Sequence, residues 1–477
     1  MTLEWIGIVF LALGLLLLWS APERLLGLQI LACVFAGSAA LGLPALGGAT
    51  VAPALASLAV LFACVLRYGH FNSLLAALAP GRAGAWLLAL CVWGVLSAFL
   101  MPRLFAGEVD VISMDRNQLT LGLSVPLIPL APGTGNLTQT AYVAGEVFVF
   151  AVALVFLRLE GGLERAGRAV LWLAAINLLA AAVDLFGYYA GLGNLLAPLQ
   201  TASYAFMPEA SFGGIKRING TFPEASAFAG FTLPVLAFCY VMFRENLWRR
   251  ASGPLAIGTL AALLLSTSSS GYAGLAIYGL TAFTVAFVSG SRRGGQMYVG
   301  HYVRLTTVAL LAVTALLVLL PGLREQAWSI IESTLLYKGE SASALERGEW
   351  NRVSWQAFLD TWGLGAGLGS ARASSLSMVL ASNLGLPGIV LFAGFIAHVL
   401  FARLPAGMTH QQRVIVIAAR HAVLANLIVA TISASVFDLG VLFYVFCAIS
   451  CCPALLFRSP SPAPAAPAAA PPLEARA

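Results

Sequence analysis

The stretch GAWLLALCVWGVLSAFLM, residues 84–101, decides the fold class of this chain. It runs without a single charged side chain, and Arg82 lies just before it. A helix of about 20 mostly apolar residues spans the hydrocarbon core of a bilayer, where it satisfies its own backbone N–H and C=O groups. This stretch is therefore expected to form a transmembrane helix.

Apolar segments of this kind recur through nearly the whole chain. Its 477 residues are 60% hydrophobic and only 10% charged, whereas soluble domains carry about 25% charged residues, so most of its surface is expected to face lipid. The sequence therefore predicts an all-α, polytopic transmembrane helical bundle of about 12–13 spans over residues 1–457. The Pro/Ala-rich segment 458–477 is expected to be disordered. The candidate spans are 3–20, 25–43, 50–66, 84–101, 139–158, 168–190, 225–243, 253–267, 271–289, 303–320, 376–402, 414–433 and 436–457.

Arginine placement predicts the side of the membrane on which each loop lies. Lys and Arg are enriched in cytoplasmic loops, and the short loops that carry most of the arginines all fall on one side, which is assigned to the cytoplasm. This leaves the N-terminus and the loops 102–138, 191–224 and 321–375 outside. The arginines that set the orientation are Arg24, Arg67, Arg82, Arg158, Arg165, Arg168, Arg244, Arg249, Arg250, Arg292, Arg293, Arg403, Arg413 and Arg458.

Scarce residue types argue against several kinds of chemistry. The seven cysteines include no CxxC pair and lie mostly in apolar runs, so we interpret them as apolar fillers. None of the five histidines falls in an outer loop, which argues against a histidine base or a zinc site there. No Walker A or HExxH motif occurs, so we predict neither a metal nor a cofactor.

The first candidate site lies just before the span at 225–243. Lys216 and Arg217 lead through residues 218–223 to Glu224. Cationic side chains suit phosphate oxygens, and arginine offers them a planar fork of donors, so Lys216 and Arg217 are candidate substrate-binding residues. Glu224 has two interpretations, a charge that complements the dipole of the following helix or a catalytic carboxylate.

The second candidate site combines an arginine with a glycine run in the loop 321–375. Arg352 precedes the alternating glycines Gly363, Gly365, Gly367 and Gly369. Alternating glycines let a backbone approach a ligand and leave N–H groups free. We therefore predict that Arg352, Gly365, Gly367 and Gly369 bind substrate.

Helical periodicity in the same loop predicts two short helices against the membrane, over Gln326–Leu336 and Trp350–Thr361.

Between two spans, the hydroxyl-rich turn Ser266–Gly271 either caps helix ends or lines a polar cavity, and capping is the favoured interpretation. Ionisable residues inside spans mark functional sites by default, with structural pairing as the competing account. These residues are Asp184, Glu146, Arg420 and His421, with Asp438 near an outer boundary.

Three of these segments together resemble the bacterial O-antigen ligase and O-antigen polymerase superfamily. The resemblance covers roughly residues 210–400. Segment 217–226 is similar to the R-x-x-G-x-F-x-(E) block of that family, and segment 266–271 to its serine-rich turn, which here lacks the usual arginine. Segment 352–370 is similar to the outer-loop block that ends in G-x-G-x-G-S, with the R-x10-G spacing from Arg352 to Gly363.

The resemblance implies a metal-independent membrane glycosyltransferase of polysaccharide biosynthesis. Its donor would be an undecaprenyl-pyrophosphate-linked glycan, used at the periplasmic face of the bacterial inner membrane to make O-antigen, lipopolysaccharide or exopolysaccharide. Arg217 and Arg352 would clamp the pyrophosphate, and Glu224 would take the proton of a glycan or lipid acceptor.

Two alternatives stay open on the sequence. The ligase branch of the superfamily typically has a histidine in the large outer loop, and this chain lacks one. The choice between polymerase and ligase activity therefore stays open. The sequence also leaves open which sugar is transferred and which acceptor receives it. From another class, a lipid-linked oligosaccharide transporter or flippase is the alternative, since Asp184 and Arg420 lie within spans.

Overall fold

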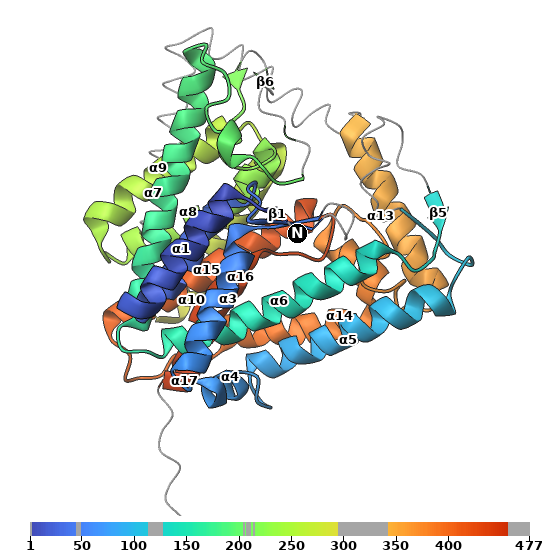
Figure 1. Cartoon of the computed structure of the whole chain (residues 1–477), viewed down its shortest axis with the longest axis horizontal. Helices are drawn as coiled ribbons and strands as arrows, with labels where there is room; N and C mark the ends of the chain where they lie inside the picture. The colour runs from blue at the N-terminus through green and yellow to red at the C-terminus, as the bar shows by residue number, and fades with distance from the viewer. Residues whose placement is uncertain are drawn as a thin grey trace, which may run out of the picture.

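The computed structural model describes residues 2–43, 49–112, 127–203, 206, 211–212, 215–293 and 342–456. Three predictions lie outside the described residues: the span at 303–320, the helix at 326–336 and the tail at 458–477. Figure 1 shows the arrangement of the helices.

The described part of the chain is an all-α polytopic membrane protein, as predicted. Six of its helices are long and apolar enough to cross a bilayer. A seventh span counts if α3 (Pro53–Arg67) and α4 (Phe71–Ala77), which meet at a bend of 117°, are taken together. The six helices are α5 (Ala83–Leu104), α6 (Thr134–Leu157), α7 (Gly162–Tyr189), α8 (Ala225–Arg244), α14 (Leu376–Phe401) and α15 (His410–Ser433).

Further helices and small strand pairs complete the described part of the bundle. The helices are α1 (Trp5–Ser20), α2 (Leu25–Ala32), α9 (Arg249–Leu265), α10 (Ser269–Arg293), α13 (Ala342–Asp360), α16 (Val441–Cys451) and α17 (Pro453–Leu456), with the 3₁₀ turns Pro22–Arg24, Cys33–Phe35 and Ala197–Leu199. The strands are β1 (Thr2–Leu3), β2 (Leu41–Leu43), β3 (Ala49–Val51), β4 (Asp110–Ile112), β5 (Leu127–Pro129), β6 (Ser211–Phe212) and β7 (Ile215–Lys216), which pair antiparallel in the order β1-β2-β3, β4-β5 and β6-β7.

The prediction of a continuous span at 25–43 is wrong. Helix α2 ends at Ala32, and the chain then turns into β2, which pairs with β1 and β3. A Cβ placed on Gly37 would lie 2.1 Å from the carbonyl oxygen of Thr221. The turn is therefore fixed by a close backbone approach from a distant part of the chain, which outweighs the local apolar pattern.

Helix α16 forms the centre of the bundle. Every residue from Phe443 to Ile449 is 0% exposed, which fits a helix that is apolar all round. Helix α15 packs against both α16 and α8, and Figure 1 shows α16 enclosed by other helices. The lipid-facing helices differ sharply, since Leu16 and Trp19 of α1 are 63% and 69% exposed.

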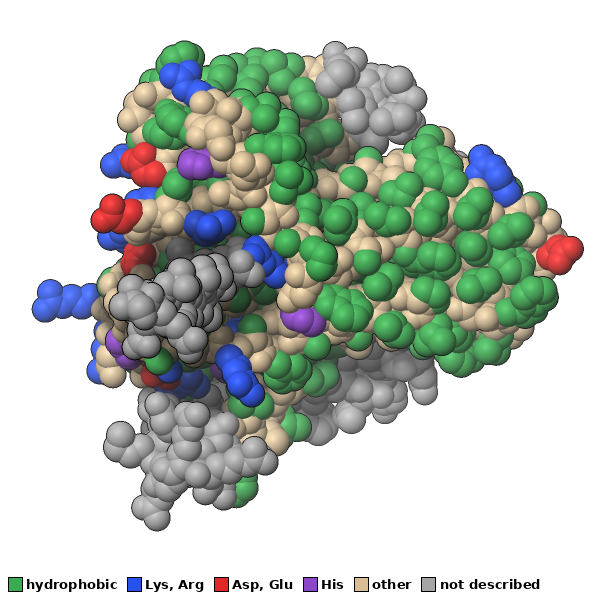
Figure 2. Space-filling view, turned by 90° about the horizontal axis from the view of Figure 1, so that it is seen from below, with side chains coloured by type: hydrophobic (Ala, Val, Ile, Leu, Met, Phe, Trp, Pro, Cys, Tyr) green, Lys and Arg blue, Asp and Glu red, His purple; other side chains and the backbone are tan. Residues whose placement is uncertain are grey.

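The arginine-bearing loops lie together at one end of the helices, as predicted. Glu23, Tyr68, Leu159 and Arg165, from three such loops, line one cavity. A fourth and a fifth loop meet where His410 Nε2 lies 3.2 Å from the carbonyl oxygen of Glu245. Figure 2 shows charged side chains gathered at one end of the molecule, beyond which hydrophobic side chains cover the surface. We call this end the arginine-rich side and the opposite end the outer side.

The N-terminus lies on the outer side. The indole Nε1 of Trp5 donates to the carbonyl oxygen of Pro198, at 3.1 Å, in the loop that follows α7. The backbone N–H of Glu4 donates to Ala40 in the turn before β2. This placement agrees with the prediction that the N-terminus lies opposite the arginine-bearing loops.

Candidate functional site

The segment from Lys216 to Glu224 is anchored at the outer end of α7 by a buried ion pair. Lys216 Nζ lies 3.3 Å from Asp184 Oδ1, and the two side chains are 1% and 8% exposed. Asp184 Oδ2 also accepts from the backbone N–H groups of Asn219 and Gly220, at 2.8 and 3.0 Å. Because a buried charge needs compensation, this carboxylate binds the turn of the segment as well as the lysine.

Apolar and polar contacts hold the rest of the segment. Ile218 and Phe222 are 1% and 4% exposed and pack on Phe228 of α8. The Thr221 hydroxyl donates to the carbonyl oxygen of Val34. These contacts make the segment a fixed element between α2, α7 and α8.

Lys216 therefore has a structural position. Its ammonium is committed to Asp184 and to the carbonyl oxygen of Arg217, at 2.7 Å, and its 1% exposure leaves no route for a ligand in this structure. Asp184 is paired structurally, with a lysine rather than with Arg420.

Arg217 is placed differently from its neighbour. Its side chain is half-buried, and its Nε has no hydrogen-bond partner among the described residues. Its charge acts on the hydroxyl of Tyr272, which donates to the carbonyl oxygen of Leu264 at 2.6 Å. Arg217 therefore sits by the turn between α9 and α10, on the outer side.

The hydroxyl-rich turn Ser266–Gly271 caps helices, as the sequence favours. Ser266 Oγ donates to the carbonyl oxygen of Leu263 at 2.7 Å, and Ser268 Oγ accepts from the N–H of Gly271 at 3.4 Å. A Cβ on Gly271 would lie 2.8 Å from the Cβ of Ala229, so this glycine lets α10 pack on α8.

Glu224 is the N-cap residue of α8, and its side chain is exposed. Its carboxylate accepts a hydrogen bond from Ser226 and makes no cap bond to the helix backbone. Both sequence interpretations remain compatible with this position, since the charge lies at the helix N-terminus and the side chain is exposed.

Arg352 lies on α13, the helix that confirms the prediction over 350–361. Its side chain is 67% exposed and forms a two-pronged pair with Glu349, at 2.9 Å (Nε to Oε2) and 2.5 Å (Nη2 to Oε1). The hydrogen bond from Arg352 lowers the pKa of Glu349.

The end of α13 carries an exposed apolar stripe. Trp355 and Leu359 are each 48% exposed and Trp362 is 84% exposed. Trp355 and Leu359, four residues apart, lie on one face of α13, and Trp362 follows two residues beyond the end of the helix. Tryptophans gather at membrane–water interfaces. This stripe therefore fits a helix that lies at the membrane surface, as expected from the sequence.

The glycine run packs inside the protein, and the expectation that it leaves N–H groups free is wrong. The N–H of Gly365 donates to Thr361 Oγ1, that of Gly367 to the carbonyl oxygen of Asn383, and that of Gly369 to Asn383 Oδ1, at 3.0 to 3.1 Å. All three glycines have positive φ. The donors are therefore used by the protein itself.

Close backbone contacts explain why glycine is required in this run. An added Cβ would lie 2.7 Å from the backbone nitrogen of Gly385 at position 365, 2.6 Å from the carbonyl oxygen of Ser97 at position 367 and 2.3 Å from that of Gly135 at position 369. The loop thus re-enters the bundle between α5, α6 and α14. Irregular backbone at membrane depth is tolerated where protein surrounds it.

Two buried asparagines hold this re-entrant loop, and the sequence analysis missed both. Asn383 Oδ1 accepts three backbone N–H groups at 3.1 to 3.2 Å, from residues 369–371. Asn136 Nδ2 donates to the carbonyl oxygen of Leu368 and to Ser370 Oγ, each at 2.8 Å. The signal available was an asparagine inside the apolar span at 376–402 and another just before the span at 139–158, each a polar group that needs a partner.

The structure does not bring Arg217 and Arg352 into contact. Figure 1 places α13 away from β6 on the outer side, and the charged partner of Arg352 is its near neighbour Glu349. A third outer arginine, which the sequence analysis passed over, is Arg372, whose guanidinium lies 5.2 Å from the ring centre of Trp350.

The remaining intramembrane ionisable residues have local partners. His421 Nδ1 lies 2.9 Å from the Tyr278 hydroxyl, and Arg420 donates to the carbonyl oxygen of Ala402 at 2.5 Å. Glu146 is 3% exposed and faces Tyr444 and Asp438, although neither of its oxygens has a hydrogen bond of normal geometry within the described part.

Within the described residues, no group of three or more His, Cys, Asp or Glu is placed to hold a metal ion. Among the described residues of the outer side, one fixed segment thus carries a half-buried arginine, Arg217, and an exposed carboxylate, Glu224. No family model, no curated protein and no solved structure matches this chain.

Proposed function

We propose that this membrane protein is a glycosyltransferase that acts at the outer side of its membrane and transfers a glycan from a polyprenyl pyrophosphate to a hydroxyl acceptor. One observation supports this most: the half-buried Arg217, whose Nε lacks a partner among the described residues, lies on a segment that the Asp184–Lys216 pair fixes. A fixed donor is already oriented before the ligand arrives, which is how electrostatic stabilisation is most effective.

The chemistry asked of the site is modest. The bond between the anomeric carbon and the pyrophosphate oxygen breaks, and the acceptor oxygen bonds to that carbon. The lipid pyrophosphate leaves with the electron pair and gains negative charge, which Arg217 stabilises. The acceptor proton passes to a carboxylate, and Glu224 supplies one at the start of α8.

The location suits a lipid-linked donor. The segment lies at the outer ends of α7 and α8, two of the helices that cross the bilayer. A lipid tail can lie in the bilayer beside them while the glycan stays in water. The positive-inside rule assigns the arginine-rich side to the cytoplasm, which in a bacterial inner membrane makes the outer side periplasmic.

Arg352 enters the proposal as a second donor that acts after a rearrangement. Its side chain is exposed and pairs with Glu349, so it is free to exchange that partner for pyrophosphate. The exposed tryptophans of α13 keep the helix at the membrane surface, where a lipid-linked donor diffuses.

The test is transfer by the purified protein, with a polyprenyl-pyrophosphate oligosaccharide and without ATP or added metal. Arg217→Ala is expected to lower the rate about 10²-fold or more, while Arg217→Lys retains part of it because the charge remains. Arg250→Gln, at an exposed arginine on the other side, serves as the control. Equal rates for wild type and Arg217→Ala would refute the proposal.

A lipid-linked oligosaccharide transporter is the second candidate, and Glu146 favours it. A buried carboxylate in a span, near Asp438 and Tyr444, is the kind of group that proton-coupled carriers use. Movement of intact labelled donor across proteoliposomes, lost in Glu146→Gln and retained in Arg217→Ala, would support the carrier and contradict the transferase.

Polymerase and ligase activities are separated by the glycan of a deletion strain. Surface glycan that carries only a single repeat unit indicates that the deleted protein is a polymerase. Full-length polymer that is not attached to its acceptor indicates a lost ligase.

A further inference from the structure

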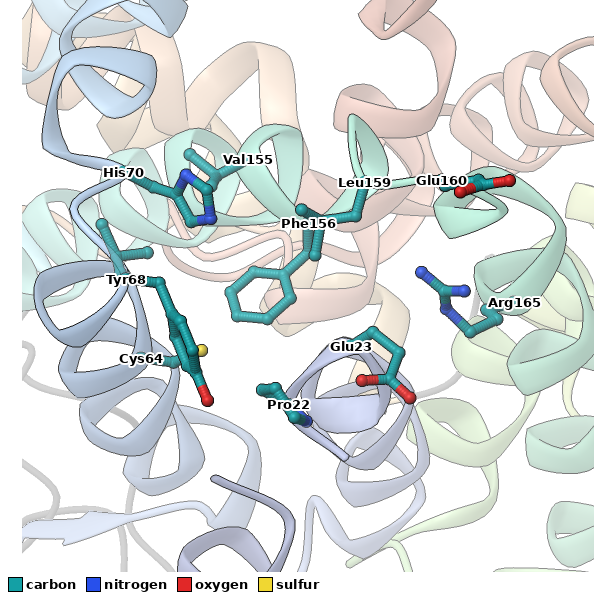
Figure 3. Close-up of a pocket in the computed structure, with 11 residues that line it drawn as sticks. Pro22, Glu23, Cys64, Tyr68, His70, Val155, Phe156, Leu159, Glu160 and Arg165 are labelled. Atoms are coloured by element: carbon teal, nitrogen blue, oxygen red, sulfur yellow. The ribbon is translucent and has the colours of Figure 1, made fainter. Parts of the chain in front are cut away.

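Two adjoining cavities open at the arginine-rich side, far from the proposed transferase site. Their volumes are about 310 and 520 Å³, and Glu23, Phe156 and Arg165 line both. Figure 3 shows the smaller one, with Arg165 and Glu23 projecting toward the same space and the ring of Phe156 beside them. The larger cavity continues between α1, α2 and α7.

The larger cavity is an apolar groove that faces lipid. Its walls include Leu17, Leu28 and Leu31, and its membrane end is marked by Trp172, which is 67% exposed. Trp172 lies two helical turns beyond Arg165 on α7, so the groove reaches ~10 Å into the bilayer from the arginine. This depth corresponds to the first part of an acyl chain.

The other end of the groove is cationic. Arg24, Arg165 and Arg168 line it, against the single carboxylate of Glu23. None of the three arginines belongs to an ion pair among the residues that the structure describes. Arg165 Nε is buried and has no hydrogen-bond partner among the described residues. A buried guanidinium N–H without a partner is costly unless a bound anion accepts its hydrogen bond.

The two ends therefore match one kind of molecule. The apolar walls favour an acyl chain, and the three arginines favour a phosphate at the level of the headgroups. Basic pockets between transmembrane helices on the cytoplasmic side recognise anionic lipid headgroups in this way. A free phosphate would satisfy the arginines but would leave the apolar groove to neutral lipid.

We propose that this groove is a binding site for an anionic glycerophospholipid of the cytoplasmic leaflet. The phosphate diester accepts from Arg165, assisted by Arg24 and Arg168, and one acyl chain lies along Leu28 and Trp172. The site is independent of the transferase proposal, since it uses another set of helix ends.

The experiment measures lipid retained by the full-length protein. Protein is purified from mixed micelles that contain phosphatidylglycerol and phosphatidylcholine in equal amounts, and bound lipid is counted by native mass spectrometry. Wild type is expected to retain phosphatidylglycerol in preference to phosphatidylcholine. Arg165→Gln combined with Arg168→Gln is expected to weaken retention about tenfold or more, whereas Arg250→Gln leaves it unchanged.

A second variant tests the apolar half without changing charge. Gly27 lines the groove, and a Cβ there would meet only the Cβ of Ala169, at 3.7 Å. Gly27→Leu is therefore expected to fill the groove and to displace the lipid while the protein still elutes as wild type in size exclusion.

Three results would overturn the proposal. One is retention of phosphatidylglycerol by Arg165→Gln/Arg168→Gln at the wild-type level. Another is equal retention of the two lipids by wild type. The third is displacement of the lipid by glycerol phosphate at equal concentration, which would mean that the arginines bind a free phosphate and the groove contributes nothing.

Discussion

Neutralising the buried pair under the proposed site gives the sharpest prediction. Asp184→Asn leaves Lys216 buried and charged with only the carbonyl of Arg217 at 2.7 Å as a close partner. Removing one member of a buried ion pair costs about 3–5 kcal/mol of the free energy of unfolding. Lys216→Met is expected to cost less, about 2 kcal/mol, because Asp184 keeps its hydrogen bonds from Asn219 and Gly220.

The double variant Asp184→Asn/Lys216→Met is expected to be more stable than Asp184→Asn alone. It buries no charge at this position, and the asparagine oxygen still accepts the two backbone N–H groups. We expect a loss of only about 1–2 kcal/mol against wild type. The coupling between the two substitutions would then be about 3 kcal/mol or more.

The assay is unfolding by sodium dodecyl sulfate in dodecyl maltoside micelles, followed by tryptophan fluorescence at fixed protein and detergent concentrations. Arg250→Gln, an exposed change on the opposite side, is the control and should lie within about 0.5 kcal/mol of wild type. A double variant no more stable than Asp184→Asn would refute the view that the pair is compensated internally.

Three further predictions concern the glycine run, α13 and the membrane sides. Gly369→Ala, where a Cβ meets the carbonyl oxygen of Gly135 at 2.3 Å and φ is +81°, should cost more than about 2 kcal/mol, whereas Gly279→Ala, whose Cβ meets nothing within 4 Å, should be neutral or stabilising in the same unfolding assay. The pKa of Glu349, measured by carbon-13 NMR, should lie below the ordinary value of 4.5 and should rise toward 4.5 in Arg352→Gln. The ion pair is then fully formed above pH 4.5 and is lost as the pH falls through the lowered pKa of the folded protein. A wild-type pKa at or above 4.5 would contradict this. Because all the native cysteines are buried, a membrane-impermeant maleimide added to spheroplasts should label Arg352→Cys and not Arg250→Cys, and the opposite pattern would invert the assigned topology.

The sequence predicts well where one physical rule dominates. Long apolar runs become helices that cross the bilayer, because burial of charge in hydrocarbon is costly wherever it occurs in the chain. Arginines gather at one end of these helices, because Lys and Arg are enriched in cytoplasmic loops. The helix around Trp350–Thr361 follows from local periodicity in the same way, although α13 begins earlier, at Ala342.

Features that depend on a distant partner were not predictable. The break after Ala32 is imposed by the backbone near Thr221, and the partner of Asp184 is a lysine from the next outer segment. No spacing rule links such residues. The glycine run shows the same limit, because a run that cradles a ligand and a run that packs against other backbones need the same residue type at the same positions.

The re-entrant glycine loop has a consequence for how the chain is assembled. Leu368 bonds to Ser97 and Asn136 across 271 and 232 residues of sequence. Helices α5 and α6 thus leave the ribosome long before the loop that completes their contact. Until that loop is made, Ser97 and Asn136 lack their hydrogen bonds to Leu368. Synthesis of these helices and their final closure are separate events, and any chain that stops before Gly363 exposes an unfilled polar slot.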